Sequence, residues 1–224
     1  MIIIESAAVG PFFKNGFVVA CPRSREGILI DPGDEVDTLL SFAASQDIKL
    51  NRILLTHAHV DHITGVHRAK QVLGVPVHLH RDDLFLYERA VEHGAMFGLR
   101  VDPPPPAIDE FYTPDNTFSF GDVEARPHHT PGHCPGGVCL EVTNGAGTAG
   151  RAGGAVGANT HLFVGDTLFA GSIGRTDLPG GDYATLIASI KTVLFAFGDA
   201  ARVYPGHGPT TTIGQERRTN PFLI

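Results

Sequence analysis

A run of potential metal-binding side chains stands directly after a short apolar segment and limits the folds open to this chain. The segment ends at Leu55, has the composition of a buried strand, and leads straight into the sequence THAHVDH. Residues two apart in an extended chain point to the same side, so His57 and His59 are placed to bind one metal ion. Asp61 and His62 come a step later in a turning loop, where they can face a second ion. Loops that follow strands often carry binding or catalytic residues, because the rigid sheet fixes their position.

Three further candidate ligands stand in similar settings. His133 ends a Thr-Pro-Gly-His turn, Asp166 follows the predicted strand 162–164, and His207 in Pro-Gly-His follows the predicted strand 202–204. Each residue alone is more typical of a surface position or a turn. Because a sheet gathers the ends of its strands at one edge, the set together predicts a centre for two metal ions.

Short strands and helices alternate along the chain, which favours an α/β fold. We expect strands at Ile2–Ala8, Phe17–Cys21, Gly27–Ile30, Arg52–Leu55, Val77–Leu79, Phe118–Phe120, Val123–Arg126, Val138–Val142, Leu162–Val164 and Arg202–Tyr204. We expect helices capped by Asp34 and Asp182, and helices at Gly65–Gly74 and Asp82–Phe97. Residues 144–160 are rich in Gly and Ala and predict a flexible loop.

Composition limits the possible classes of function. The 224 residues are predicted to form a single domain, 1–224, with an ordinary apolar content of 42%. The net charge of −7, without a Lys/Arg run, argues against a nucleic-acid partner. Three cysteines make no disulfide framework, and no apolar run is long enough for a membrane span or signal peptide. We therefore expect a cytoplasmic protein with no membrane partner.

The motifs THAHVDH, TPGH, GDTLF and PGH resemble the successive motifs of the metallo-β-lactamase superfamily. Residues 165–182 and the C-terminal segment are similar to its single-domain glyoxalase II-like (hydroxyacylglutathione hydrolase-like) subgroup. The resemblance implies a four-layered αββα sandwich, without the C-terminal helical domain that helps to hold glutathione in glyoxalase II proper. It assigns the seven candidate ligands as follows: His57, His59 and His133 to one metal ion, Asp61, His62 and His207 to the other, and Asp166 to both.

The resemblance implies a thioesterase that uses a metal-bridging hydroxide on a small-molecule substrate, with glutathione-derived thioesters as one candidate class. Imidazole and carboxylate ligands suit two divalent ions, zinc first and iron or manganese as alternatives. Asp61 or Asp166 would relay the proton. Arg175 is similar in position to a basic residue that contacts the substrate carboxylate in the family, and the alternative is a structural ion pair with Asp177 or Asp182.

Three other functions stay open from the sequence. One is a mononuclear-iron oxidoreductase similar to persulfide dioxygenases, which would use a subset such as His57, His133 and Asp166. Another is a non-enzymatic metal-binding module, although structural zinc sites usually have four ligands rather than seven. Hydrolysis of β-lactams is the third, because a fold does not determine a function.

Overall fold

The computed structural model describes residues 1–145 and 159–224, and the chain divides into two compact units, Met1–Thr113 and Pro114–Ile224. Among the described residues, each unit carries one six-stranded sheet. The division does not test the expectation of a single domain, which stays a prediction. The predicted loop 144–160 falls largely on residues 146–158, outside the described part of the chain.

The sheet of the first unit has the strand order β1-β2-β3-β4-β5-β6. Its strands are β1 (Ile3–Val9), β2 (Lys14–Ala20), β3 (Glu26–Ile30), β4 (Lys49–Leu54), β5 (Val77–Leu79) and β6 (Glu110–Phe111). The first three strands are antiparallel neighbours, whereas β3 to β6 run parallel to one another. Parallel strands are buried on both faces, which explains the nearly unbroken apolar runs Ile28–Ile30 and Ile53–Leu55.

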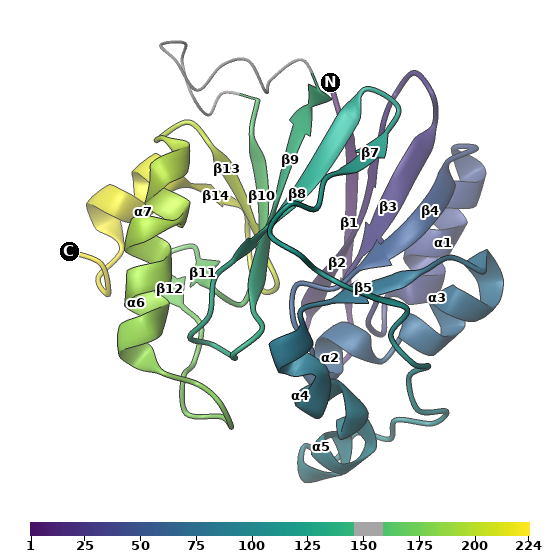
Figure 1. Ribbon diagram of the computed structural model, residues 1–224, viewed down its shortest axis with the longest axis horizontal. Helices are drawn as coiled ribbons and strands as arrows, with labels where there is room; N and C mark the ends of the chain where they lie inside the picture. The colour runs from purple at the N-terminus through teal and green to yellow at the C-terminus, as the bar shows by residue number, and fades with distance from the viewer. Residues whose placement is uncertain (146–158) are drawn as a thin grey trace. The chain divides into compact units, whose positions relative to one another are not determined.

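The helices of the first unit are α1 (Val36–Ser45), α2 (Val60–Ile63), α3 (Val66–Leu73), η1 (Arg81–Asp83), α4 (Leu84–Glu88) and α5 (Ala90–Met96). Figure 1 shows α1 and α3 side by side along one face of this sheet, with α4 and α5 following β5. The segment predicted as one helix at 82–97 is divided, because Arg89 adopts φ −98° and ψ 17° and so ends α4 and precedes α5.

The predicted cap of the first helix is wrong by one residue. Glu35, not Asp34, is the residue before α1, and its side chain makes no capping hydrogen bond. The Asp34 carboxylate instead accepts a hydrogen bond of 2.9 Å from the hydroxyl of Thr64, at the end of α2. This residue therefore connects the turn after β3 to the helix that carries two candidate ligands.

The sheet of the second unit has the order β14-β13-β10-β9-β8-β7. Its strands are β7 (Phe118–Phe120), β8 (Val123–His129), β9 (Val138–Asn144), β10 (His161–Gly165), β13 (Arg202–Pro205) and β14 (Thr211–Thr212), and β11 (Leu168–Phe169) and β12 (Ser172–Ile173) form a separate hairpin. Strands β7 to β10 are antiparallel neighbours, and β10 and β13 are parallel.

Helical segments that accompany this second sheet are α6 (Tyr183–Thr192), η3 (Leu194–Phe197) and α7 (Ile213–Thr219). As predicted, Asp182 caps α6, accepting a 2.7 Å hydrogen bond from the backbone N–H of Thr185. Leu186 and Ile190 of α6 are fully buried in one core with Val203 of β13. Burying each such side chain contributes roughly 1.5–3 kcal/mol, and this contact fixes α6 against the sheet.

Candidate metal centre

In the first unit, the candidate ligands gather because parallel strands end at the same edge of a sheet. Asp31 follows β3, His57 follows β4, and Asp83 lies in η1 just after β5. Ligand atoms of Asp31, His57 and His62 all lie within 4.8 Å of one another. The rings of His57 and His62 are 4.0 Å apart between centroids, and those of His57 and His59 are 4.9 Å apart. The structure thus brings the three predicted histidines of this segment together.

A buried carboxylate, Asp31, organises this cluster. One carboxylate oxygen accepts the backbone N–H of Thr56 at 2.6 Å, and the other accepts the Thr56 hydroxyl at 2.5 Å. The second oxygen also lies 3.0 Å from Nδ1 of His62. A carboxylate can only accept, so His62 donates from Nδ1 and presents Nε2 as its metal-binding atom.

The tautomer of His57 follows from the same network. Its Nδ1 lies 3.1 Å from the hydroxyl oxygen of Thr56. A hydroxyl has one hydrogen, and that of Thr56 is directed to Asp31, so Nδ1 of His57 must be the donor. The Nε2 atoms of His57, His59 and His62 are all buried. Histidine ligands held through Nδ1 in this way bind metal through Nε2.

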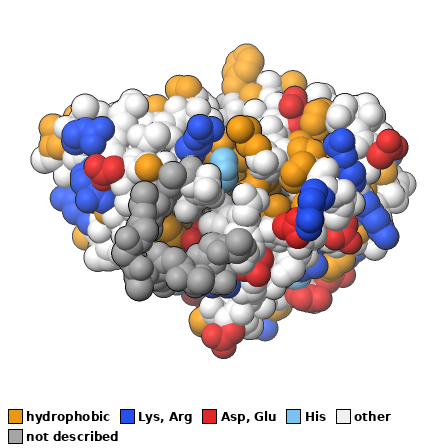
Figure 2. All heavy atoms as spheres, turned by 90° about the horizontal axis from the view of Figure 1, so that it is seen from above, with side chains coloured by type: hydrophobic (Ala, Val, Ile, Leu, Met, Phe, Trp, Pro, Cys, Tyr) orange, Lys and Arg blue, Asp and Glu red, His pale blue; other side chains and the backbone are white. Residues whose placement is uncertain are grey.

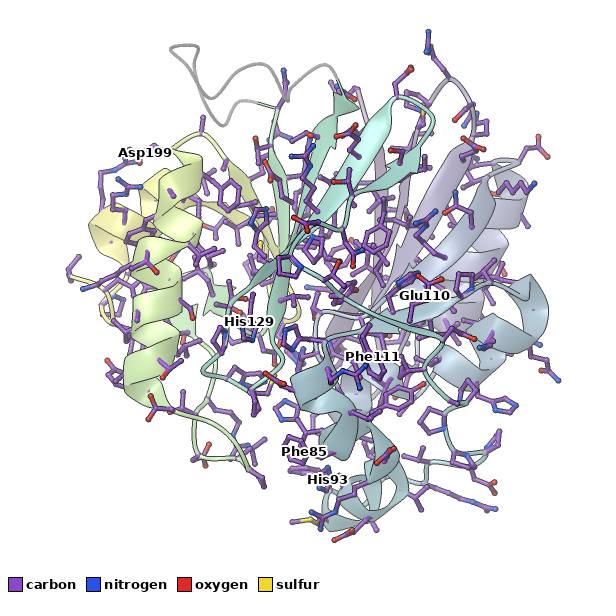
Figure 3. The ribbon with its side chains drawn as sticks, viewed as in Figure 1. Phe85, His93, Glu110, Phe111, His129 and Asp199 are labelled. Carbon is purple, nitrogen blue, oxygen red and sulfur yellow. The ribbon has the colours of Figure 1, made fainter. Side chains whose placement is uncertain are left out.

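A second buried carboxylate, Asp83, holds the start of the ligand segment. One of its oxygens accepts the backbone N–H of Ala58 at 3.0 Å, and the residue is fully buried. The neighbouring Arg81 places its guanidinium 4.0 Å from the ring centre of Phe111 in β6, whose position Figure 3 marks. The loop after β5 is therefore attached both to the edge of the sheet and to the ligand segment.

In the second unit the candidate ligands come from three separate segments. Strands β8, β10 and β13 run in the same direction, and His133, Asp166 and His207 follow their carboxyl ends. One oxygen of Asp166 lies 3.7 Å from Nε2 of His133 and 3.5 Å from Nε2 of His207. The structure brings these three predicted ligands together within their unit.

The backbone of a neighbouring loop orients His133. Its Nδ1 lies 2.7 Å from the carbonyl oxygen of Arg175, and a carbonyl can only accept, so His133 also donates from Nδ1. Gly174 allows this close approach. A Cβ atom there would lie 1.8 Å from the carbonyl oxygen of Asp166 and 3.2 Å from Nδ1 of His133.

Both clusters fit a divalent metal ion by their donor chemistry and their spacing. Two ligands of a tetrahedral ion with bonds of about 2.0–2.1 Å lie about 3.4 Å apart. The contacts of Asp166 described above, at 3.5 and 3.7 Å, are close to that spacing, as is the 3.7 Å between Asp61 and Nε2 of His62. Imidazoles fixed as Nδ1–H tautomers and carboxylates form a donor set suited to zinc, iron or manganese.

The Arg175 side chain is engaged in the ion pair that the sequence left as an alternative. Its Nε and a terminal nitrogen each lie 2.7 Å from a carboxylate oxygen of Asp177, and both side chains are exposed. Hydrogen bonding from Arg175 lowers the pKa of Asp177 from 3.8 to about 2. The same pair raises the pKa of Arg175. The expectation that Arg175 binds a substrate stays a prediction.

The sequence interpretation missed the groups that orient the ligands: Asp31, the Thr56 hydroxyl, Asp83 and the Arg175 carbonyl. A signal was present for two of them. Asp31 and Asp83 follow apolar strands, as the predicted ligands do. The carbonyl of Arg175 carries no signal in the sequence, because every residue has one.

Sheets with helices against them, carrying His and Asp side chains at the carboxyl ends of their strands, define a metal-binding protein of the α/β class. Residues 9–148 and 145–207 match the model of the metallo-β-lactamase superfamily. The chain belongs to this superfamily of metallo-hydrolases, which bind divalent metal ions. The predicted fold class is confirmed. Each unit has a six-stranded sheet and helices, which is consistent with an αββα sandwich.

Similar proteins cover nearly the whole chain. Hydroxyacylglutathione hydrolase GloC of Haemophilus influenzae is 38% identical over 98% of this chain and 97% of its own length. The crystal structure of TTHA1623 in a di-iron-bound form is 39% identical, with a TM-score of 0.81 over 98% of this chain and 100% of that one. The crystal structure of BLEG-1 B3 metallo-β-lactamase is 33% identical, with a TM-score of 0.81 over 99% of both chains.

The surface and the helices also bear on the predicted partners. Acidic and basic side chains lie interspersed on the face that Figure 2 presents. In the described ranges 1–145 and 159–224, none of the helices combines the length and the apolar character that are needed to cross a bilayer.

Proposed function

We propose that this chain is a dinuclear metal-dependent hydrolase that cleaves thioesters of the hydroxyacylglutathione type. The observation that carries the proposal is the 38% identity to hydroxyacylglutathione hydrolase GloC over 97% of that protein's length. Nearly all of a protein named for this activity is therefore matched by the residues of this chain. The fixed tautomers of His57, His62 and His133 support the metal-dependent part of the proposal.

The proposed centre uses all seven candidate ligands, with the assignment that the family resemblance implies: His57, His59 and His133 for one ion, Asp61, His62 and His207 for the other, and Asp166 for both. Zinc is our first expectation for the ions. The di-iron-bound form of TTHA1623 makes iron the principal alternative.

When bound, the two ions would lower the pKa of water towards about 7 and polarise the thioester carbonyl. The residues of the chain do the rest. Asp61 or Asp166 takes the proton of the attacking water as its oxygen bonds to the carbonyl carbon. The carbon–sulfur bond then breaks, and the same proton passes to the departing sulfur. The products are a hydroxy acid and a thiol.

Arg175 is our proposed contact for a carboxylate of the substrate. Its guanidinium already forms a two-pronged contact with the carboxylate of Asp177. A substrate carboxylate would take the place of Asp177 with the same geometry. Because the pair is exposed, the exchange requires little desolvation.

Hydrolysis of β-lactams is a second candidate, and the observation that favours it is the likeness to BLEG-1 B3 metallo-β-lactamase over 99% of both chains. The same attack by water would open an amide instead of a thioester. A thiolate leaves more readily than an amine, which favours the thioester as the better substrate.

The test is a substrate panel with the purified, metal-loaded protein: a hydroxyacyl thioester of glutathione, a thioester of another thiol, and a β-lactam. We expect the glutathione thioester to give the highest kcat/KM. His57→Ala should lower kcat/KM by about a thousand-fold or more, whereas His93→Ala, a change of a partly buried histidine on α5 (Figure 3), should leave it unchanged. Absence of thioester hydrolysis by the loaded wild-type protein would contradict the proposal, and a higher kcat/KM for the β-lactam would replace it.

A further inference from the structure

A buried lysine lies beside the ligand cluster of the first unit, and the proposed mechanism does not use it. Lys14 begins β2, and only 2% of its side chain is exposed. Its Nζ donates to the carboxylate of Glu35, of which 1% is exposed, and to the backbone carbonyl oxygen of Asp31. Lysine is almost never fully buried unless it is paired, so this position needs a physical reason.

The backbone of Asp31 supplies one reason. This residue adopts φ +48°, in the left-handed region that residues with a side chain rarely enter. Such a conformation costs free energy and persists only where the surrounding structure enforces it. Here the Asp31 N–H donates to the carbonyl of Leu54 at 3.2 Å, and Lys14 binds the Asp31 carbonyl from the opposite end of the residue.

Glu35 holds the turn that follows. The oxygen that accepts from Lys14 also accepts the backbone N–H of Gly33 at 2.9 Å. The turn is packed closely against the ligand segment. A Cβ atom on Gly33 would lie 2.2 Å from the carbonyl oxygen of Asp61 and 3.0 Å from Nζ of Lys14. A movement of Lys14 or Glu35 would therefore move both Asp31 and the turn on which the ligand segment rests.

We propose that Lys14 and Glu35 form a positioning pair that keeps Asp31 in its left-handed conformation and thereby sets the orientation of the histidine ligands. The pair touches none of the metal-binding atoms. It acts through Asp31, whose carboxylate directs the ring of His62 and, through Thr56, the ring of His57. This inference rests on the proposed metal centre but not on the thioesterase activity assigned to it.

Stability alone is a weak explanation for the pair. Burying two opposite charges carries a desolvation cost that commonly equals or exceeds their attraction, and neutral replacements are often tolerated. A pair present only for stability could be neutralised on both sides without consequence for the histidines. A positioning pair could not, because the hydrogen bond to the Asp31 carbonyl would be lost.

The double variant Lys14→Met/Glu35→Gln separates these two roles. It leaves no charge at either position of the pair, and the introduced glutamine side chain keeps an oxygen that can accept from the backbone N–H of Gly33, so the variant should fold. The Asp31 carbonyl, however, loses its lysine donor. A matched control is Lys70→Met, which removes a lysine of the same unit from its pair with Asp109, away from Asp31.

Three readouts are to be compared: Co²⁺ affinity by competition with a chelator, the Co²⁺ absorption spectrum, and hydrogen exchange of the Thr56 amide in metal-free protein. That amide donates to Asp31. We expect the double variant to melt within a few degrees of the wild type, to bind Co²⁺ about 10–100-fold more weakly with an altered spectrum, and to exchange the Thr56 amide faster. Lys70→Met should leave all three readouts unchanged.

Wild-type Co²⁺ affinity, spectrum and Thr56 exchange in the double variant would overturn the inference. If the double variant does not fold, the single change Glu35→Gln provides the test, with the same readouts and a smaller expected loss of affinity. A wild-type protein that binds Co²⁺ tightly but hydrolyses no thioester would contradict the proposed function and leave this inference intact. A wild-type protein that binds no Co²⁺ would overturn both.

Discussion

The two ligand clusters are built in different ways. In the first unit, the candidate ligands lie in one continuous segment, and His57 and His62 are essentially fully buried. Their rings are held by side chains, Thr56 and Asp31. In the second unit, the three ligands come from three separate segments, and 28% of the His207 side chain is exposed.

The difference shows which contacts fix the geometry of the ligands in each cluster. The first cluster depends on buried polar side chains, so its geometry should be sensitive to single substitutions of residues that bind no metal. In the second, the ligands follow three different strands, and a backbone carbonyl, that of Arg175, accepts from the ring of His133. This second cluster should be sensitive to changes of the backbone and tolerant of most changes of side chain outside the ligands themselves.

The largest effects are expected from removing a ligand from each cluster. His57→Ala and His207→Ala should both lower kcat/KM by about a thousand-fold or more, since metal stabilisation of the transition state is worth several kcal/mol. Their effects on folding should differ. In metal-free protein, His57→Ala should lower the free energy of unfolding by about 1–3 kcal/mol, because it disrupts a buried network.

His207→Ala should change the free energy of unfolding by less than about 0.5 kcal/mol, as is usual for partly exposed positions. Urea unfolding of both metal-free variants measures the contrast. Equal losses of stability would show that the two clusters do not differ in the way described.

The next largest effect is expected from Asp31→Ala. The Asp31 side chain is not a metal ligand in our assignment. The change leaves the N–H groups of Thr56 and His62 without their acceptor. Metal affinity should fall about 10–100-fold. Each buried donor left unsatisfied should also lower the free energy of unfolding by about 1–3 kcal/mol.

Isothermal titration with Zn²⁺ measures this loss of affinity. Asp31→Asn is the matched control, because it keeps the shape and one acceptor oxygen and should lose less affinity than Asp31→Ala. A wild-type affinity in Asp31→Ala would remove the basis for the buried network of the first unit.

A smaller effect is expected from Gly174→Ala in the second unit. The new Cβ would collide with the carbonyl of Asp166 and press on the ring of His133. The strand ends must shift, and metal affinity should fall by about tenfold. Gly171→Ala is the control: it is strained at φ +70° but has open space around its Cβ, so it should affect stability without changing affinity. The backbone dependence of this cluster would be disproved by equal affinities of the two variants.

The smallest effect concerns the exposed pair of Arg175 and Asp177. Arg175→Ala should raise KM for a carboxylate-bearing thioester a few-fold with kcat unchanged, and Asp177→Asn should lower KM by freeing the guanidinium. The pKa of Asp177 is depressed to about 2, so any stabilisation from the pair is present above the ordinary value of 3.8 and is lost as pH falls towards 2. Neither variant should alter the pH profile near neutrality. An unchanged KM in both would leave the pair a purely structural contact.

Much of the fold follows from the sequence by simple patterns. Apolar runs located strands such as β3 and β10, and the cap at Asp182 located α6, because burial and capping leave local signals. The short strands β6, β11, β12 and β14 were not predicted. Each has only two residues, too few to show a period, and each is defined by its pairing with another strand: β6 with β5, β11 with β12, and β14 with β13.

The candidate site shows the same limit. The ligands of the first unit could be identified because they share one short segment with a regular spacing. The position of Asp31 after an apolar strand was a signal, but it could not reveal the role of the residue. That role depends on β3 and β4 pairing in parallel, so that residues 25 positions apart form a hydrogen bond. Lys14 could not be assigned either. Its role depends on a left-handed backbone conformation at Asp31, which no pattern in the sequence predicts.

We propose that the seven candidate ligands of this chain hold two metal ions. Native mass spectrometry of the protein loaded with zinc or iron, before and after treatment with a chelator, counts those ions directly. Two ions per chain in the wild type, and fewer in both His57→Ala and His207→Ala, are the predicted result. A wild-type chain that holds one ion or none under every loading condition would contradict the proposed dinuclear centre.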